Sequence, residues 1–161
     1  MGDARKLDGK PVRNFARRSA WATWLRSNHA KSTGVWVRIA RKGSTRSSVT
    51  QAEALEVALC YGWIDGQARS EGADFWLQKF TPRGKRSIWS KRNREKVAVL
   101  MKRGEMRAPG LAEVERAKAD LDSRNRYAVL FRIQTAKKAE TRARRIAQFV
   151  AMLSRNERVY D

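Results

Sequence analysis

The 161-residue chain has one cysteine, one histidine and three prolines, and its 16 acidic residues stand against 36 basic ones. Because Cys60 and His29 are single residues of their kinds, an internal disulfide is impossible and a four-ligand zinc site is not expected. No apolar run reaches the roughly 18 residues of a membrane span, and the N-terminal sequence lacks the apolar core of a secretory signal. We therefore expect a cytoplasmic protein that has no membrane span and needs no metal or other cofactor.

The excess of basic residues gives a formal net charge of +20, which is distributed unevenly. Residues 1–49, 79–107 and 123–161 carry the basic excess, and residues 50–78 and 108–122 between them are acidic overall. A field of this kind attracts polyanions such as nucleic acid, nucleotides or an anionic lipid surface, although a basic surface can also serve solubility alone. Six tryptophans and 42% hydrophobic residues indicate a folded protein and exclude a disordered basic tail.

Hydrophobic periodicity predicts an α+β fold, with a small antiparallel three-stranded sheet, about five to six helices and a helical C-terminal half. We expect one domain spanning residues 1–161, in which residues 1–18 form a basic and flexible N-terminal arm. Alternating β-branched and aromatic residues predict the strands, and capping residues ahead of periodic apolar residues predict the helices. The predicted strands are 35–42, 63–70 and 74–83, and the predicted helices are about 20–30, 51–61, 91–103, 111–120, 124–134 and 138–155.

Several helix ends carry specific signals. Thr50 and Glu53 have the spacing of a capping box, and Gly62 is suited to a left-handed residue at the end of the helix that follows them. Ser90 is suited to cap the next helix. Cys60 has no histidine near it in the sequence and ends an apolar helix, so we interpret it as a small core residue rather than a nucleophile.

The basic segment "KFTPRGKRSIWSKRN", residues 79–93, is the densest candidate binding site. Arginine, lysine, hydroxyl groups, an indole and the start of a helix can all contact phosphates or bases. In the alternative interpretation the segment is a solvated loop, in which Trp89 fills the core and Ser90 only caps a helix. The candidate ligand-binding residues, among which no catalytic or metal-binding role is assigned, are Asp65, Thr81, Arg83, Ser87, Trp89, Ser90, Lys91, Asn93, Arg142 and Arg145.

Asp65 lies in "GWIDG" and Arg142 lies on the last predicted helix. A lone carboxylate among apolar residues can act as a general base or can pair with an arginine that fixes the fold, and we favour the ion pair. Helical periodicity places Arg142 close to the apolar stripe that contains Ile146 and Phe149, so this arginine is expected to point towards the core. Asp65 is its first predicted partner, whereas the alternative is an Arg142 that extends into solvent.

Four motifs occur in order along the chain: "ALCYGWIDGQAR", "FTPRGKRSIWSKRN", "LMKRGEMRAPGLAEVERAKAD" and "AKKAETRARRIAQFVAML". Together they resemble the YdeI/OmpD-associated family, also called the bacteriocin-protection family. The resemblance covers nearly all of the chain and implies a small bacterial cytoplasmic protein whose molecular activity is not established. The chain departs from the family pattern near residues 119–124, where the connection after "AKAD" is shorter.

The leading hypothesis is a non-enzymatic basic protein that binds a phosphate-bearing or nucleic-acid ligand through residues 83–93, Arg142 and Arg145. A second hypothesis is a small-molecule enzyme that uses Asp65 with Arg83 and Arg142. A third is a protein-interaction factor in stress or envelope tolerance, for which the sequence names no protein partner. Salt-sensitive binding of oligonucleotides would favour the first hypothesis over the other two.

Overall fold

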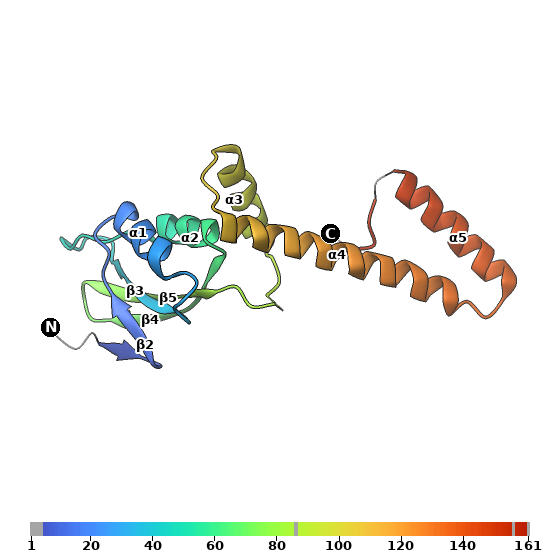
Figure 1. Ribbon diagram of the computed structural model, residues 1–161. Coiled ribbons are helices and arrows are strands. Elements are labelled where there is room, and N and C mark those ends of the chain that lie inside the picture. Colours follow the sequence, from blue (N-terminus) through green and yellow to red (C-terminus); the bar gives the residue numbers. More distant parts are fainter. Residues whose placement is uncertain (1–4, 86, 156, 161) are drawn as a thin grey trace. The chain divides into compact units, whose positions relative to one another are not determined.

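The computed structural model describes residues 5–85, 87–155 and 157–160 (Figure 1). It has an α+β architecture that divides into two compact units, Met1–Glu113 and Val114–Asp161, which are described separately below. The strands within the described residues are β1 (Lys6–Leu7), β2 (Lys10–Arg13), β3 (Val35–Ala40), β4 (Trp63–Glu71) and β5 (Phe75–Pro82). The helices are α1 (Arg18–Asn28), α2 (Gln51–Cys60), α3 (Lys91–Lys102), α4 (Ala108–Gln134) and α5 (Ala139–Ser154).

The sheet of the first unit has the strand order β1-β2-β3-β5-β4. β2 is parallel to β3, and the other neighbouring pairs are antiparallel. The predicted three-stranded antiparallel sheet is therefore wrong in strand number, although its three strands are present and the α+β class is confirmed. The two additional strands come from the N-terminal segment, where the sequence predicts an arm.

β1 and β2 are not evident from hydrophobic pattern because they are two and four residues long and rich in charge. Their turn does have a recognisable signal, since Asp8 and Gly9 have φ angles of 52° and 72°, typical of a two-residue hairpin turn. The hairpin is held in the sheet by tertiary contacts, because Val12 packs in a cluster with Trp36 and Leu77. Such long-range packing cannot be deduced from eight residues of local sequence.

Helices α1 and α2 lie over one face of the sheet and enclose the aromatic core of the first unit (Figure 1). Trp21 of α1 is fully buried, with ring centroids 5.5 Å from Phe80 and 6.5 Å from Trp63. The Trp21 indole Nε1 donates to the Ala54 carbonyl oxygen of α2 at 3.0 Å, so the core tryptophan also ties the two helices together. On the other face of the sheet, Trp36 is buried beneath the cations of Arg69 and Lys79.

In the second unit, the C-terminal part of α4 and helix α5 form a helical hairpin in which Ala128, Ala136 and Phe149 are buried. The sequence predicts two helices, 111–120 and 124–134, where the structure has the single helix α4. The segment "DLDSR" between them contains neither glycine nor proline, so nothing in it interrupts the backbone hydrogen bonds of a continuous helix. None of the helices in the described part of the chain is both long and apolar enough to span a membrane.

Candidate functional site

In the loop between β5 and α3, the described residues 83–85 and 87–90 are organised around Arg83. The Arg83 side chain is 6% exposed, and its Nη2 donates to the main-chain oxygens of Ser87 at 3.3 Å and Ile88 at 2.9 Å. Its guanidinium carbon lies 3.9 Å from the centroid of the Trp89 ring. The Arg83 main-chain N–H donates to the Gly62 carbonyl at 3.0 Å, which joins the start of the loop to the left-handed residue after α2. Arg83 therefore holds the loop from inside.

Several predicted site residues take structural roles at this loop. The guanidinium of Arg83 stacks on Trp89, and the indole Nε1 of Trp89 is buried without a hydrogen bond to a described residue. Ser90 caps α3, as predicted, because its hydroxyl accepts from the main-chain N–H of Asn93 at 3.2 Å. Asn93 itself is buried, and Ser87 is half-buried. The cap at Ser90 agrees with the alternative interpretation, whereas Trp89 is half-buried against Arg83 rather than filling the core. A direct ligand contact by these residues stays a prediction.

The loop presents one large apolar side chain to solvent, that of Ile88, which is 83% exposed. Sequence reasoning missed this residue. A signal was present, because Ile88 lies among hydroxyl and basic residues in "KRSIWSKR", without the spaced apolar neighbours of a helix or strand face. Packing in the hydrophobic core therefore does not explain why an apolar residue stands at position 88.

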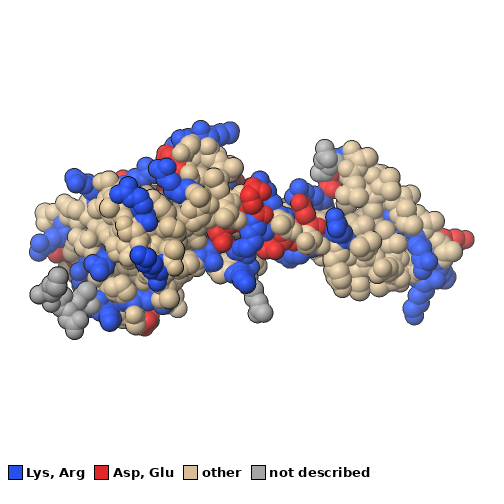
Figure 2. All heavy atoms as spheres, in the orientation of Figure 1, with Lys and Arg blue, Asp and Glu red and all other residues tan. Residues whose placement is uncertain are grey.

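Basic side chains surround the loop. Residues 83–94 contain six basic and no acidic residues, and Figure 2 shows that Lys and Arg side chains are spread over the surface of the first unit. Lys91 is exposed and lies 4.0 Å from Glu95 one helical turn later. Arg92 and Arg94 are also exposed, and neither makes an ion pair with a described residue. The first turn of α3 thus continues the positive surface of the loop.

Asp65 and Thr81 are separated by the sheet. Asp65 of β4 pairs with Phe80 of β5, whereas Thr81 pairs with Ile64, so the side chains of Asp65 and Thr81 extend from opposite faces. Both residues are half-buried. Asp65 makes no ion pair with any described residue of the first unit. The expected carboxylate–arginine pair is therefore not formed within this unit.

The other two predicted site residues, Arg142 and Arg145, belong to α5 in the second unit. Arg142 is exposed, and its Nη2 donates to the Ala136 carbonyl at 3.4 Å; Arg145 donates to the Arg132 carbonyl. Arg142 lies two turns before the buried Phe149 on the same face of α5, but its own side chain is exposed, and its Nη2 bonds the main chain of the preceding loop rather than a carboxylate. Its approach to Asp65 stays a prediction, because the two residues lie in different units.

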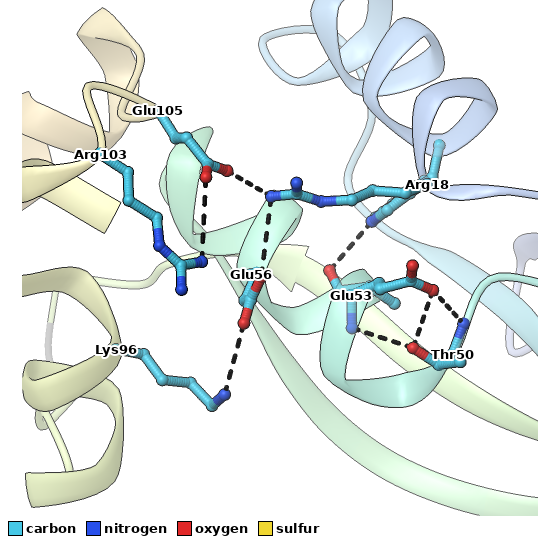
Figure 3. Close-up of polar contacts among 9 residues, drawn as sticks. Arg18, Thr50, Glu53, Glu56, Lys96, Arg103 and Glu105 are labelled. Carbon is cyan, nitrogen blue, oxygen red and sulfur yellow. Dashed lines mark hydrogen bonds and ion pairs between the residues drawn. The ribbon is translucent and has the colours of Figure 1, made fainter. Parts of the chain in front are cut away.

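Two acidic residues of the first unit, Glu56 and Glu105, form a separate network of ion pairs beside α1, α2 and α3 (Figure 3). Arg18 Nη2 donates to Glu105 at 2.5 Å and lies 3.7 Å from Glu56. Lys96 and Arg103 approach the same two carboxylates, each at 3.9 Å. The hydrogen bond to Glu105 raises the pKa of Arg18, although burial opposes this shift. The network ties three helical segments together and neutralises acidic charge within the fold.

A groove of about 490 Å³ lies beside this network, lined by residues that include Arg17, Cys60, Tyr61 and Arg107. Cys60 is buried, and desolvation raises the pKa of its thiol to about 11, so the thiolate required of a nucleophile is scarce at neutral pH. This agrees with its interpretation as a core residue. The described residues contain no group of three histidine, cysteine or acidic residues that could hold a metal ion.

Two family models match consecutive parts of the chain. The first, described as a domain of unknown function, DUF8412, matches residues 13–113, more than half of the 161 residues. The chain belongs to this family. The second model, described as Bacteriocin-protection, YdeI or OmpD-Associated, matches residues 112–156. No curated protein and no solved structure matches the chain.

The second match confirms the family resemblance predicted from the sequence, but over the C-terminal part alone. Residues 58–93, which supplied two of the resembling motifs, lie in the DUF8412 part. The junction of the two matches, at residues 112–113, falls within one or two residues of the boundary between the compact units. The loop with its basic surface is thus a feature of the DUF8412 part, whereas Arg142 and Arg145 belong to the other.

Proposed function

We propose that the protein binds nucleic acid, and that residues 83–94 contact its phosphate backbone. The observation that carries the proposal is that this segment has no acidic residue, that Arg83 holds its main chain at Ser87 and Ile88 from inside, and that four of its other basic side chains are exposed: Lys85, Lys91, Arg92 and Arg94. Preorganisation matters because a loop that is already ordered loses little conformational entropy on binding. Phosphate contacts by arginine and lysine then supply most of the affinity of sequence-independent binding.

The pairing of acidic residues elsewhere supports the same proposal. Glu56, Glu71 and Glu105 each contact two basic side chains within the first unit. The cations of Arg92 and Arg94, in contrast, have no carboxylate within ion-pair distance among the described residues. These three carboxylates are thus neutralised within the first unit, and the uncompensated positive charge of Arg92 and Arg94 faces solvent, where it attracts a polyanion.

The enzyme hypothesis receives less support from the geometry. It requires Asp65 to act beside Arg83 and Arg142, but Nη2 of Arg83 donates to main-chain oxygens of its own loop, and Nη2 of Arg142 donates to the Ala136 carbonyl of its own helical unit. The deeply buried position of Arg83 also suits a structural role better than substrate binding. We therefore retain nucleic-acid binding as the proposed function.

The test is the salt dependence of binding to a fluorescein-labelled 20-base-pair duplex and to its single strand, measured by fluorescence anisotropy between 25 and 200 mM NaCl. We expect the logarithm of the affinity to fall linearly with the logarithm of the salt concentration. The double variant Arg92→Gln/Arg94→Gln should lower that slope by about 2 for the duplex, because each lost phosphate contact lowers it by about 0.9.

Lys42→Gln/Arg46→Gln is the control, since it removes the same formal charge beyond the other end of β3, and the ion pair that it breaks, Arg46 with Asp74 at 3.6 Å, is exposed to solvent. β3 begins at Val35 beside Phe80 and ends at Ala40 beside Phe75, which places residues 42 and 46 at the opposite end of the sheet from residues 83–94. The control should keep at least three quarters of the wild-type slope. The proposal is refuted by the absence of binding at 25 mM NaCl, or by equal losses in the two double variants.

A further inference from the structure

Among the described residues of the first unit, Ile88 has the most exposed of the large hydrophobic side chains, at 83%. A single exposed apolar residue is ordinary when its backbone is free to move. Here the Ile88 carbonyl accepts a hydrogen bond from buried Arg83, and the Ser87 N–H donates to the Gly84 carbonyl at 3.0 Å. The next residue, Trp89, lies under the Arg83 guanidinium. The backbone on both sides of Ile88 is therefore fixed, and the side chain is held in solvent.

We propose that Ile88 inserts between neighbouring base pairs of a bound duplex and kinks it, an inference that rests on the proposed function. Minor-groove proteins frequently insert isoleucine, leucine, phenylalanine or methionine as such wedges and use arginine and lysine beside them. A backbone that is already held in place lowers the entropy cost of the insertion. Both features are present here, because Arg83 bonds the Ile88 carbonyl, and the exposed basic residues Lys91 and Arg92 follow Ile88 by three and four positions. The cations would hold the phosphates while the apolar side chain enters the base stack.

An anionic lipid surface is the competing ligand for a basic loop with an exposed apolar tip. One isoleucine offers far less apolar surface than a myristoyl chain, and even a myristoyl chain binds membranes only marginally. A base-step wedge, in contrast, requires a single side chain. The size of the apolar tip therefore favours the duplex.

The experiment measures bending by energy transfer between dyes at the two ends of a 20-base-pair duplex with a central TA step, which is easily unstacked. Saturating wild-type protein should shorten the end-to-end distance as expected for a kink of about 20–90°. Ile88→Ala should abolish the change and leave the salt slope unaltered, and Ile88→Leu should retain it. The affinity of Ile88→Ala should change by less than about tenfold, because the lost apolar contact is offset by stacking that is no longer disrupted.

Val99→Ala is the matched control, since Val99 is an apolar residue of α3 that is 45% exposed and lies outside the loop. It should bend the duplex as the wild type does. No duplex binding at all would refute the proposed function. Salt-dependent binding without bending, or bending that persists in Ile88→Ala, would overturn the wedge and leave the proposed function standing. The lipid arm uses vesicles of equimolar phosphatidylglycerol and phosphatidylcholine. If Ile88→Ala loses vesicle binding but binds and bends the duplex as the wild type does, the wedge is overturned in favour of a lipid ligand.

Discussion

Replacement of Arg83 by methionine is expected to destabilise the first unit by about 2–4 kcal/mol. The hydrogen bond from Arg83 to the Ile88 carbonyl is 2.9 Å long and has a charged donor, a class worth about 1.5–3 kcal/mol. The bond to Ser87, at 3.3 Å, is weaker, and stacking of the desolvated guanidinium on Trp89 adds about 1–2 kcal/mol. Methionine fills part of the volume of the arginine side chain, and water can bond to the freed carbonyls when the loop opens. The variant therefore loses only part of the summed free energy of the hydrogen bonds and the stacking.

Urea unfolding followed by far-ultraviolet circular dichroism measures this change. With a slope of roughly 2 kcal/mol per molar urea, the midpoint should fall by about 1–2 M. Amide hydrogen exchange at residues 84, 85 and 87–90 should accelerate in the same variant, because this part of the loop loses its anchor at Ser87 and Ile88. Lys91→Met is the control, since the Lys91 side chain is exposed and its ion pair with Glu95 is 4.0 Å long, and its cost should stay below about 0.5 kcal/mol. A midpoint for Arg83→Met that equals the control's would refute the view that Arg83 orders the loop.

Three further predictions concern α2 and its surroundings. Gly110→Ala should lower the free energy of unfolding in urea by about 2–3 kcal/mol. A Cβ at this position would lie 2.4 Å from the Cys60 carbonyl oxygen and 2.7 Å from that of Leu59, and a neutral effect would contradict this close packing. The main-chain N–H of Thr50 lowers the pKa of Glu53, so this carboxylate stabilises the fold above its ordinary pKa and the benefit disappears as the pH falls through the lowered value. Glu53→Gln should therefore flatten the dependence of the urea midpoint on pH between about 5 and 3, and an unchanged profile would count against the capping box. Burial raises the pKa of Cys60 to about 11, so its contribution to stability is complete below the ordinary value near 9 and declines as the pH rises towards 11. Thiol labelling at pH 8 should be slower in the native protein than in urea by about 100-fold or more, and comparable rates would show that the thiol is accessible.

Local structure in this chain is largely determined by local sequence. The capping box at Thr50 and Glu53, the positive φ of Gly62 and the cap at Ser90 were all predicted and are all present. β3 follows from the alternation of its apolar residues. Signals of this kind lie within a few residues of the structure that they specify, because caps, turns and strand faces depend on short-range hydrogen bonds and on side-chain periodicity.

The candidate site could be located from sequence, but its internal organisation could not. Composition alone identifies residues 79–93 as the basic and aromatic segment, and it includes Arg83 and Trp89 among the ligand candidates. The structure turns Arg83 inward and leaves Ile88 outside. Nothing in the identity of an arginine or an isoleucine determines which of them is buried, because that choice depends on the path of the loop over its neighbours.

What the sequence by itself determined is the α+β class, the core strands, most helix ends and the position of the positive charge. The tertiary structure alone decided that the N-terminal hairpin joins the sheet through Val12, and that α4 continues without a break. It also decided that Glu56 and Glu105 are engaged in ion pairs within the fold while Arg92 and Arg94 face solvent. The physical reason is the sequence separation of the contacts: these features depend on residues that are distant in the chain, and such residues meet only when the backbone has folded.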